Sequence, residues 1–377
     1  MIKRFIRRVL GLPSETMLRV PRDKHGLGRE AISPSAARVC SALREAGFSA
    51  YVVGGAVRDL LLGITPKDFD IATDARPEQI KPLFRRALII GRRFRLVHVM
   101  FGPETVEVST FRGADTETST DKDHTHVRDE HGRVLRDNVF GTQEEDARRR
   151  DFSVNALYFD PVSEEVVDFH GGLADLKKRS LRVIGDPETR YREDPVRMLR
   201  GVRLAAKLGL TLDPATRQPI RELAPLMERV PPARLFDEML KLLLSGHASA
   251  CLRQLRDVGL HEGLLPLLDV ILEQPLGERF VTLALAQTDE RVLTDRPVSP
   301  AFLFAALLWH EVLAASKARQ ARGERPIVAL EHAMDEVLDT QCAKLAITRK
   351  LTATMREVWS MQSRFEQRSG SRAYRLL

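Results

Sequence analysis

The strongest constraint on this fold is the stretch of residues 51–63, which is followed within a few positions by residues 68–73. The order of residue types predicts a strand, a turn at Gly54 and Gly55, a short helix and a second strand. Glycines let the backbone approach a phosphate group closely, and a helix that begins just after them directs unpaired N–H groups at that anion. The segment therefore indicates a phosphate-binding turn between a strand and a helix.

Asp68 and Asp70 belong to the second strand of this segment. Side chains two residues apart on an extended chain point to the same face, so both carboxylates can share divalent cations. A solvated surface pair is the ordinary alternative for two nearby aspartates. The apolar neighbours Phe69 and Ile71 instead imply a sheet position, where bare charges are costly without cations. We therefore expect Asp68 and Asp70 to bind metal and to support phosphoryl chemistry.

The bulk properties narrow the class of protein. At 377 residues the chain is too long for one compact core, and we expect two or three domains. The net charge of +7 and the pI near 9.5 favour a polyanionic partner. No apolar run reaches the length of a membrane span, and the start of the sequence lacks a signal-peptide pattern. Cys40, Cys251 and Cys342 are widely separated, so we expect a protein of the reducing cytoplasm.

The periodicity of apolar residues changes along the chain, from mostly β up to residue 169 to helical after about residue 181. The expected strands cover residues 51–53, 69–72, 88–90, 95–101, 105–111, 154–159 and 166–169. The expected helices cover residues 33–46, 195–208, 219–228, 233–244, 248–257, 300–315 and 330–338. These patterns predict an α+β fold, in which a small mixed or antiparallel sheet flanked by helices is followed by an all-α C-terminal half.

Two segments carry little regular pattern. Residues 1–30 are expected to form a basic N-terminal arm packed on the next domain, and peripheral membrane contact through residues 1–10 is the weaker alternative. Residues 113–137 are polar and predict a mobile loop. The loop contains three histidines, but no flanking structure would hold them in place, so we assign no metal site there.

Residues 144–155 run from acidic to basic and then enter a strand. A solvent-exposed helix with charges matched to its dipole explains much of this run. Asp151 lies where helix and strand meet, so it can supply a third carboxylate while Arg149 or Arg150 faces a triphosphate. Glu107 competes for the role of third carboxylate, and spacing alone does not choose between the two.

Residues 193–203 place Asp194, Arg197 and Arg200 three residues apart along one helical face. A salt-bridged surface would explain this face equally well. Alternatively, a carboxylate acceptor beside a guanidinium donor can meet the hydrogen-bonding edge of a base, and a further arginine can hold phosphate. The glycine pair within residues 168–176 is interpreted as the turn that links sheet to helices.

Taken in order, these motifs resemble class II nucleotidyltransferases of the DNA polymerase beta superfamily, a class that contains tRNA CCA-adding enzymes and bacterial poly(A) polymerases. The motifs are residues 54–59, 68–73, 149–155 and 193–200. The segments that resemble the poly(A) polymerase branch are residues 88–101, 231–238 and 300–306. The resemblance spans residues 20–377 and is strongest between residues 51 and 208.

The resemblance implies a set of site residues. Asp68, Asp70 and Asp151 would be the catalytic carboxylates around two Mg²⁺ ions, with Mn²⁺ as an alternative and Asp68 and Asp70 as the metal ligands. The implied nucleotide-binding residues are Gly54, Gly55, Arg58, Arg149, Arg150, Asp194, Arg197 and Arg200.

The resemblance also implies template-independent transfer of AMP from ATP to RNA 3′ ends, by a monomer, with RNA-decay proteins as further partners. Residues 31–180 would be the nucleotidyltransferase head and residues 181–250 a helical neck that binds nucleotide and RNA. Residues 251–377 would be a helical body truncated at its C-terminal end. The members of this branch extend into a basic region beyond that end.

Three other functions remain for comparison. CCA addition to tRNA uses the same site but must admit CTP as well as ATP. A non-catalytic RNA-binding protein on the same scaffold is the alternative from a different class, and the intact carboxylates Asp68, Asp70 and Asp151 argue against it. A fused phosphohydrolase would need a His-Asp dyad, which the helical half lacks.

Overall fold

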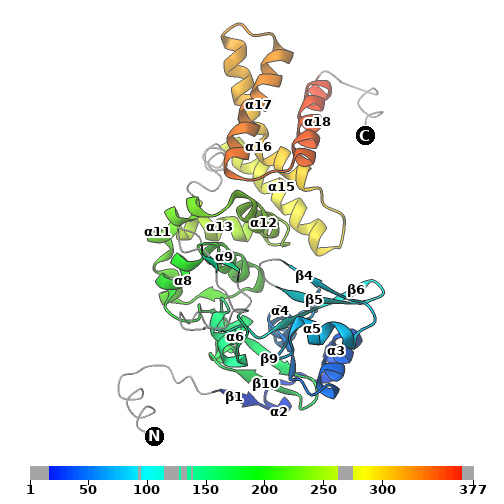
Figure 1. The fold of residues 1–377 in the computed structure, drawn as a ribbon. Helices are drawn as coiled ribbons and strands as arrows, with labels where there is room; N and C mark the ends of the chain where they lie inside the picture. The colour runs from blue at the N-terminus through cyan, green and yellow to red at the C-terminus, as the bar shows by residue number, and fades with distance from the viewer. Residues whose placement is uncertain are drawn as a thin grey trace. The chain divides into compact units, whose positions relative to one another are not determined.

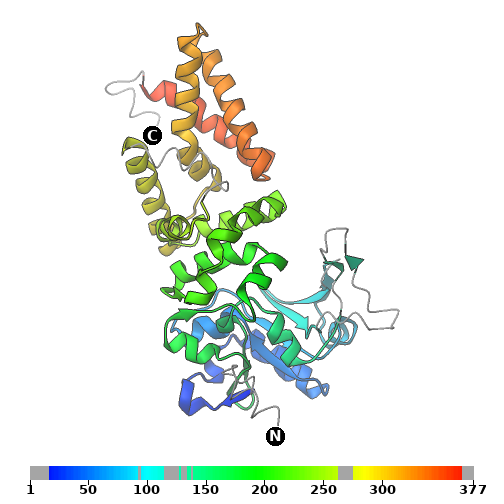
Figure 2. The same cartoon turned by 90° about the vertical axis from the view of Figure 1, so that its left-hand side faces the viewer.

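The computed structural model describes residues 17–91, 95–113, 127–128, 134–136, 139–261 and 275–366. The chain divides into two compact units, Met1–Asp186 and Pro187–Leu377, which we describe one at a time (Figure 1 and Figure 2). The expected α+β organisation is confirmed, because a sheet with its helices makes up the first unit and helices dominate the second. The finer domain boundaries inside each unit stay predictions.

A mixed sheet of eight strands forms the centre of the first unit. Its strands are β1 (Leu18–Val20), β2 (Ala50–Val53), β3 (Asp70–Thr73), β4 (Ala87–Ile90), β5 (Leu96–Phe101), β6 (Glu104–Thr110), β9 (Leu157–Asp160) and β10 (Glu165–Asp168). They lie in the order β1-β10-β9-β2-β3-β6-β5-β4. Paired strands run antiparallel except β3 and β6, which are parallel. A parallel pair requires a crossover connection, and here helix α5 (Pro77–Ile80) and the strands β4 and β5 lie between the two strands in the sequence.

The helices of the first unit are short apart from one. They are α2 (Arg22–His25), α3 (Pro34–Glu45), α4 (Gly55–Leu61), α5 (Pro77–Ile80), α6 (Gln143–Arg149) and α7 (Gly172–Lys177). Helix α3 begins as expected, because the Ser33 side chain accepts a hydrogen bond from the Ala36 N–H at 3.1 Å and Pro34 occupies the first turn. Its buried residues, including Val39 and Leu43, pack against β2, β3 and β6.

A second apolar cluster joins strand residues of this sheet to α6. Its members are Tyr51, Val53, Ala72, Phe111, Ala147, Ala156, Tyr158, Val167, Phe169 and Ile184. The Tyr158 ring meets those of Tyr51 and Phe169 edge to face, with centroids 6.2 and 6.1 Å apart. Because Asp70 precedes Ala72 by two residues, its carboxylate leaves the sheet on the same face as this cluster. The cluster therefore forms the packed apolar surface next to the Asp70 carboxylate.

The strand predictions in this unit hold to within one residue at six of the seven segments. The prediction for residues 154–159 was wrong at its start, since Ser153–Asn155 forms a turn of 3-10 helix and the strand begins at Leu157. The cause is the Asp151 carboxylate, which accepts hydrogen bonds from the Phe152 N–H at 2.8 Å and from the Asn155 side chain at 3.0 Å. These local bonds compete with strand formation.

Two further segments differ from expectation. Strand β1 lies within the expected N-terminal arm and pairs with β10 at the edge of the sheet. Residues 127–128 and 134–136 form a two-stranded pair, β7 (Val127–Arg128) with β8 (Val134–Arg136), inside the expected loop. The rest of residues 114–138, together with residues 1–16 and 92–94, lies outside the described residues.

The second unit is helical. Its helices are α8 (Pro187–Glu193), α9 (Val196–Leu208), α10 (Pro214–Arg217), α11 (Ile220–Leu223), α12 (Pro232–Leu243), α13 (Ala248–Val258), α15 (Pro275–Leu293), α16 (Pro300–Ala321), α17 (Pro326–Lys344) and α18 (Arg349–Glu366). Helices α8, α10, α15 and α18 were not expected. The expected helix over residues 219–228 is found as α11 followed by a 3-10 segment, Ala224–Arg229.

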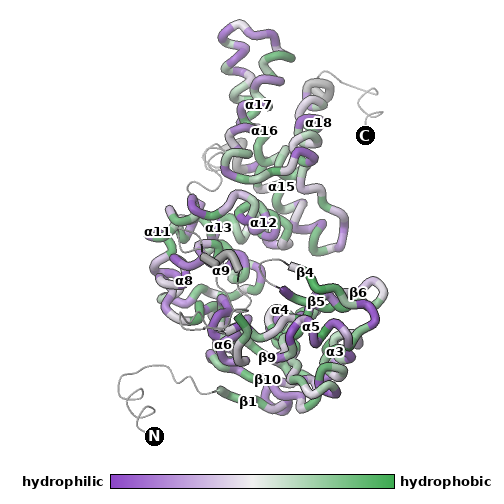
Figure 3. The backbone as a smooth tube through the Cα atoms, viewed as in Figure 1, coloured by the Kyte–Doolittle hydropathy of each residue, from purple (hydrophilic) through white to green (hydrophobic). Residues whose placement is uncertain are grey.

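Helix α16 is the longest and most apolar of these helices. Among the described residues, α16 is the one helix that is both long enough and apolar enough to cross a membrane. Half of its most apolar segment is buried inside the protein. Figure 3 shows its hydrophobic first half and its more hydrophilic end. The Trp359 indole N–H of α18 donates to the Ala305 carbonyl at 2.9 Å, and Trp359 is 1% exposed. Buried core helices of other proteins are also this long and this apolar, so α16 is only weak evidence for a membrane span.

We expect Trp359→Phe to lower the free energy of unfolding of the second unit by about 1–2 kcal/mol, because it removes a buried hydrogen bond and part of a packed ring. The chain has two tryptophans, so the fluorescence of Trp309 still reports urea unfolding of this unit in the variant. Phe302→Ala, at a side chain that is 61% exposed on the same bundle, is the matched control and should change it by less than about 0.5 kcal/mol. Equal effects of the two substitutions would contradict this account of the packing.

Candidate active site

The glycine pair closes the turn between β2 and α4. Gly54 has a φ of 77° and a ψ of −132°, which residues with a Cβ rarely adopt. A Cβ on Gly54 would lie 3.3 Å from Nη1 of Arg150, and a Cβ on Gly55 would lie 3.5 Å from Nη2 of Arg58. The turn therefore needs glycine for its backbone conformation and has two guanidinium groups against it.

The guanidinium of Arg58 is fixed in place. Arg58 is buried, and it donates hydrogen bonds to Asp59 Oδ1 at 2.8 Å and to Asn155 Oδ1 at 2.6 Å. Asn155 in turn donates to Asp151 Oδ1 at 3.0 Å. This chain of bonds holds a positive charge beside the turn, where the sequence predicted contact with a triphosphate.

Arg150 is fixed by a second network. It donates to the Tyr158 hydroxyl at 3.2 Å and to Asp146 Oδ2 at 3.1 Å, and the Tyr158 hydroxyl donates to the same oxygen at 2.6 Å. Burial lowers the pKa of Arg150, but Tyr158 and Asp146 outweigh that effect and raise it. Arg149 instead donates to the Gly113 carbonyl at 2.7 Å, so Arg150 is the one that meets the turn. Sequence reasoning missed Asp146, although its spacing of four residues from Arg150 on α6 was an available signal.

Three carboxylates lie near one another at the start of β3. The parallel register of β3 and β6 places Asp70 opposite Glu107, and Asp68 lies two residues before Asp70. Glu107 also lies opposite His98 of β5, with 3.6 Å between Glu107 Oε2 and His98 Nε2. The structure thus brings Asp68, Asp70 and Glu107 together, as the sequence suggested for the two aspartates and left open for Glu107.

Desolvation and the negative charge of these groups raise the pKa of Asp70. The residue keeps access to solvent, but atoms around its carboxylate desolvate it, and the negative charges of Glu107 and Asp68 act in the same direction. Together they raise the pKa of Asp70 to about 6, against a smaller opposing effect of Arg150. A nearby cation would therefore stabilise the ionised form of Asp70.

Asp151 has different surroundings. Its side chain is buried, and its Oδ1 accepts the two hydrogen bonds that shape the turn Ser153–Asn155. It is linked to the glycine turn through Asn155 and Arg58. The structure therefore ties Asp151 to the support of the site, while Glu107 is the carboxylate set against Asp70.

The third motif lies in the second unit, at the junction of α8 and α9. Asp194 Oδ2 accepts a hydrogen bond from Arg234 Nη2 of α12 at 3.0 Å. Arg197 donates to Glu193 Oε2 at 3.0 Å and to the Arg190 carbonyl at 2.7 Å. Sequence reasoning paired Asp194 with Arg197 and missed Arg234, which lies 40 residues away.

The donor set was tested for its fit to a metal. In the parts of the chain that the structure describes, no three His, Cys, Asp or Glu side chains converge into a ready-made metal cage. Mg²⁺ is commonly held by one or two carboxylates, with water and substrate phosphates completing its octahedron. Asp68, Asp70 and Glu107 supply hard oxygen donors on one face, and their mutual repulsion would be relieved by a cation. These residues therefore fit an Mg²⁺ ion whose coordination shell is completed by the substrate.

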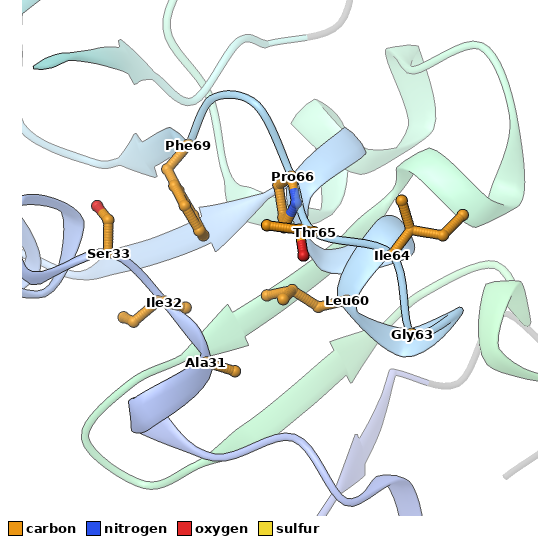
Figure 4. A pocket seen from close by; sticks show the side chains of 9 residues that line it. All are labelled: Ala31, Ile32, Ser33, Leu60, Gly63, Ile64, Thr65, Pro66 and Phe69. Atoms are coloured by element: carbon orange, nitrogen blue, oxygen red, sulfur yellow. The ribbon is translucent and has the colours of Figure 1, made fainter. Parts of the chain in front are cut away.

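A pocket of about 420 Å³ is lined in part by Phe69, the residue between Asp68 and Asp70 in the sequence. Phe69 and Leu60 point into it and Ile64 points away (Figure 4). Since Phe69 alternates with the two aspartates, it projects to the opposite side of the chain. The pocket lining contains no charged side chain, so we do not place the chemistry there.

Known proteins resemble this chain along most of its length. Family models match in three places, with the poly A polymerase head domain at residues 50–182, the "probable RNA and SrmB-binding site of polymerase A" at residues 209–272, and the polymerase A arginine-rich C-terminus at residues 322–377. Poly(A) polymerase I of Salmonella typhi is 47% identical over 362 residues, which are 95% of this chain and 78% of that protein. The chain belongs to the poly(A) polymerase I family.

CCA-adding enzymes are more distant from this poly(A) polymerase. The enzyme of Lactobacillus helveticus is 37% identical over 224 residues, which are 59% of this chain and 53% of that protein. The crystal structure of Bacillus stearothermophilus CCA-adding enzyme in complex with CTP is 26% identical, with a TM-score of 0.54, and covers 89% of this chain and 94% of that one. The predicted family and the nucleotidyltransferase fold are confirmed, and the protein is a polynucleotide adenylyltransferase.

We expect Asp70→Asn to stabilise the metal-free enzyme at pH 8. The folded-state pKa of Asp70 lies above its ordinary value of 3.8, so the protonated form favours folding, and this contribution is lost as the pH rises through about 6. Since the residue is exposed, solvent screening limits the expected gain to about 1 kcal/mol. The measurement is thermal unfolding in EDTA between pH 4 and 8.

The gain should shrink towards zero near pH 4, where wild-type Asp70 is itself protonated. Asp23→Asn, at an exposed carboxylate of α2, is the control and should shift the midpoint little at any pH. A destabilised Asp70→Asn enzyme at pH 8 would show that the carboxylate is not under repulsion.

Proposed function

We propose that this poly(A) polymerase performs its chemistry on the face of the first unit where Asp68, Asp70 and Glu107 gather, transferring AMP from ATP to RNA 3′ ends without a template. The observation that supports this assignment most is the register of β3 with β6, which sets Asp70 opposite Glu107. The glycine turn at Gly54, backed by Arg150, lies at the end of β2, next to β3 in the sheet.

The reaction joins the RNA 3′-oxygen to the α-phosphorus of ATP and breaks the bond from that phosphorus to the oxygen of the pyrophosphate, while the hydroxyl proton passes to solvent. Little covalent chemistry is left to the protein, so positioning and charge neutralisation supply most of the rate. Asp68, Asp70 and Glu107 would hold Mg²⁺, or Mn²⁺ in its place. When bound, the metal lowers the pKa of the attacking hydroxyl and offsets charge on the departing pyrophosphate.

The turn supplies the complementary charge. Arg58 and Arg150 lie against Gly55 and Gly54, so the triphosphate would meet backbone N–H groups with two fixed guanidinium groups behind them. Both arginines are already held by protein partners, and they therefore need no reorganisation when the nucleotide arrives. Arg149 donates to the Gly113 carbonyl, so its contribution would be to hold the backbone at Gly113 in place.

We assign the third carboxylate to Glu107 in preference to Asp151. Glu107 shares a face with Asp70, and its charge is felt there. Asp151 spends Oδ1 on the backbone of Phe152 and on Asn155, and through Asn155 it supports Arg58. Its effect on catalysis would then be indirect, through the position of the arginine.

Glu107→Gln is expected to lower kcat by about 100-fold or more, because it removes a metal ligand. The unfolding midpoint measured in EDTA should stay unchanged or rise slightly, since the half-exposed Glu107 carboxylate repels Asp70. Mg²⁺ should raise the midpoint of the wild type more than that of the variant. Asp151→Asn is the comparison: it should lower the free energy of unfolding by about 1–2 kcal/mol and reduce kcat less. A large loss of kcat in Asp151→Asn with unchanged stability, beside an active Glu107→Gln, would reverse the assignment.

Base choice would fall to the second unit. Asp194 lies just before α9, and Arg197 and Arg200 lie near the start of that helix. Asp194 and Arg197 are held by neighbouring side chains. A carboxylate and a guanidinium group can read the edge of adenine without a nucleic-acid template. RNA would bind the helices that follow, and this proposal is supported by the family models described as a probable RNA-binding site at residues 209–272 and an arginine-rich C-terminus at residues 322–377.

Incubation with a generic RNA and one labelled nucleotide at a time is expected to give long tails with ATP and no extension with CTP. This result would separate adenylate tailing from CCA addition, which the Bacillus relative with bound CTP represents. Asp70→Ala should abolish the tails, and retained tailing in that variant would overturn the site. Incorporation of C that ends after a short addition would support the CCA-adding alternative.

We further propose a cytoplasmic monomer. Three cysteines that are free thiols suit a reducing compartment. The neck at residues 181–250 and the body at residues 251–377 remain our assignment of the helical half. RNA-decay proteins are the partners that tailing would bring to the same substrate.

A further inference from the structure

Tyr158 lies beside the glycine turn. The pairing of β2 with β9 sets Tyr158 opposite Val53, the residue before Gly54. The Gly54 N–H donates to the carbonyl of Leu157, the neighbour of Tyr158, at 3.3 Å. Residues that face each other across an antiparallel pair project to the same face of the sheet. The fully buried Tyr158 side chain therefore leaves the sheet next to the residue from which the turn begins.

The hydroxyl of Tyr158 joins two charged groups. It donates to Asp146 Oδ2 at 2.6 Å and accepts from Arg150 Nε at 3.2 Å. Burial raises the pKa of the Tyr158 hydroxyl above its usual value, so the group stays protonated and keeps donating. The Arg150 guanidinium also lies over the Tyr158 ring, 5.3 Å from the ring centroid. Tyr158 thus restrains the arginine through both its hydroxyl and its ring.

These contacts hold one edge of the Arg150 guanidinium. Nε and Nη2 both donate to Asp146 Oδ2, at 3.3 and 3.1 Å. Nη1 lies away from that edge, 3.3 Å from the position that a Cβ on Gly54 would take, and donates to the Asn155 carbonyl at 3.4 Å. A guanidinium group is planar and rigid, so fixing the edge with Nε and Nη2 also fixes the direction of Nη1. Nη1 is therefore directed at the glycine turn.

We infer that Tyr158 is a positioning residue for the triphosphate of the bound nucleotide: together with Asp146 it holds one edge of Arg150 and so directs Nη1 at the phosphates on the glycine turn. Loss of the Tyr158 hydroxyl would leave the ion pair of Arg150 with Asp146 but would restrain the guanidinium less. This inference rests on the proposed role of Arg150 at that turn.

Packing alone does not account for the hydroxyl. Tyr158 belongs to the apolar cluster of the first unit, where its ring meets those of Tyr51 and Phe169 edge to face. A phenylalanine would supply the same ring packing without a buried polar group to satisfy. A buried ion pair is in itself weak evidence for a role in stability, because apolar replacements are often as stable. A role in holding Arg150 explains why a phenol occupies this position.

The test compares the wild type with Tyr158→Phe, using the full chain, one RNA primer and ATP. Binding of the triphosphate is measured separately as inhibition by inorganic tripolyphosphate, which carries neither base nor ribose. In the variant, the KM for ATP and the inhibition constant of tripolyphosphate should both rise by about 10-fold, which corresponds to one hydrogen bond. kcat should stay within about 3-fold, because the contact is made equally in the bound nucleotide and in the transition state.

Tyr191→Phe is the matched control. Tyr191 is fully buried in the second unit, and its hydroxyl donates to the Thr216 carbonyl at 2.9 Å. This substitution also removes a buried phenol hydroxyl, so it should lower the thermal unfolding midpoint about as much as Tyr158→Phe does. It should leave the KM for ATP and the inhibition constant of tripolyphosphate at their wild-type values.

A cycle with Arg150→Lys tests whether Tyr158 acts through the guanidinium. Lysine keeps the positive charge but has no planar edge for Tyr158 and Asp146 to hold. Arg150→Lys alone should raise both constants, and adding Tyr158→Phe should raise them no further. Asp146→Asn replaces the carboxylate with a weaker acceptor of similar shape, so it should raise both constants in the same direction as Tyr158→Phe.

An unchanged inhibition constant for tripolyphosphate in Tyr158→Phe would overturn the inference, as would a further rise in the double variant. A fall in kcat with both constants unchanged would also contradict it. Tails that the wild type makes with ATP would leave the proposed function intact in each of these cases. Failure of the wild type to extend RNA with ATP would instead overturn the proposed function itself.

Discussion

The first unit is organised around repulsion between carboxylates. Backbone pairing of β3 with β6 fixes Asp70 opposite Glu107, and Asp68, two residues before the start of β3, lies near enough for its charge to act on Asp70. The sheet cannot move these charges apart without breaking its register, and the raised pKa of Asp70 is the consequence. Metal and triphosphate would each supply what the arrangement lacks, since a cation relieves the carboxylates and an anion complements the guanidinium groups behind the glycine turn.

Short-range features of this site could be predicted from the sequence. The positive φ of Gly54 follows from paired glycines between a strand and a helix, and the shared face of Asp68 and Asp70 follows from the two-residue repeat. The start of α3 at Ser33 and Pro34 was equally local. Each of these depends on residues within a few positions of one another, where stereochemistry alone narrows the choices.

Long-range features could not be predicted in the same way. Nothing in the spacing of Glu107 says that β6 lies parallel beside β3, because the crossover between them fixes the pairing. Asp151 has a typical position for a metal ligand at the end of a helix, yet its hydrogen bonds turn it toward Phe152 and Asn155. The ion pair of Asp194 with Arg234 spans 40 residues and depends on how α12 packs near the α8–α9 junction.

The two arginine arrangements differ in burial, and that difference separates their functions. Arg150 is enclosed with Asp146 and Tyr158, so removing one partner would leave a buried charge at a cost to folding. The side chains of Arg234 and Asp194 are 44% and 23% exposed, so this ion pair is more open to solvent than the pair of Arg150 with Asp146. Phosphate binding at the glycine turn would thus depend on a network that the fold itself requires, whereas base selection, as we propose it, would depend on groups outside that network. Nucleotide preference in such an enzyme can therefore change while its chemical site stays intact.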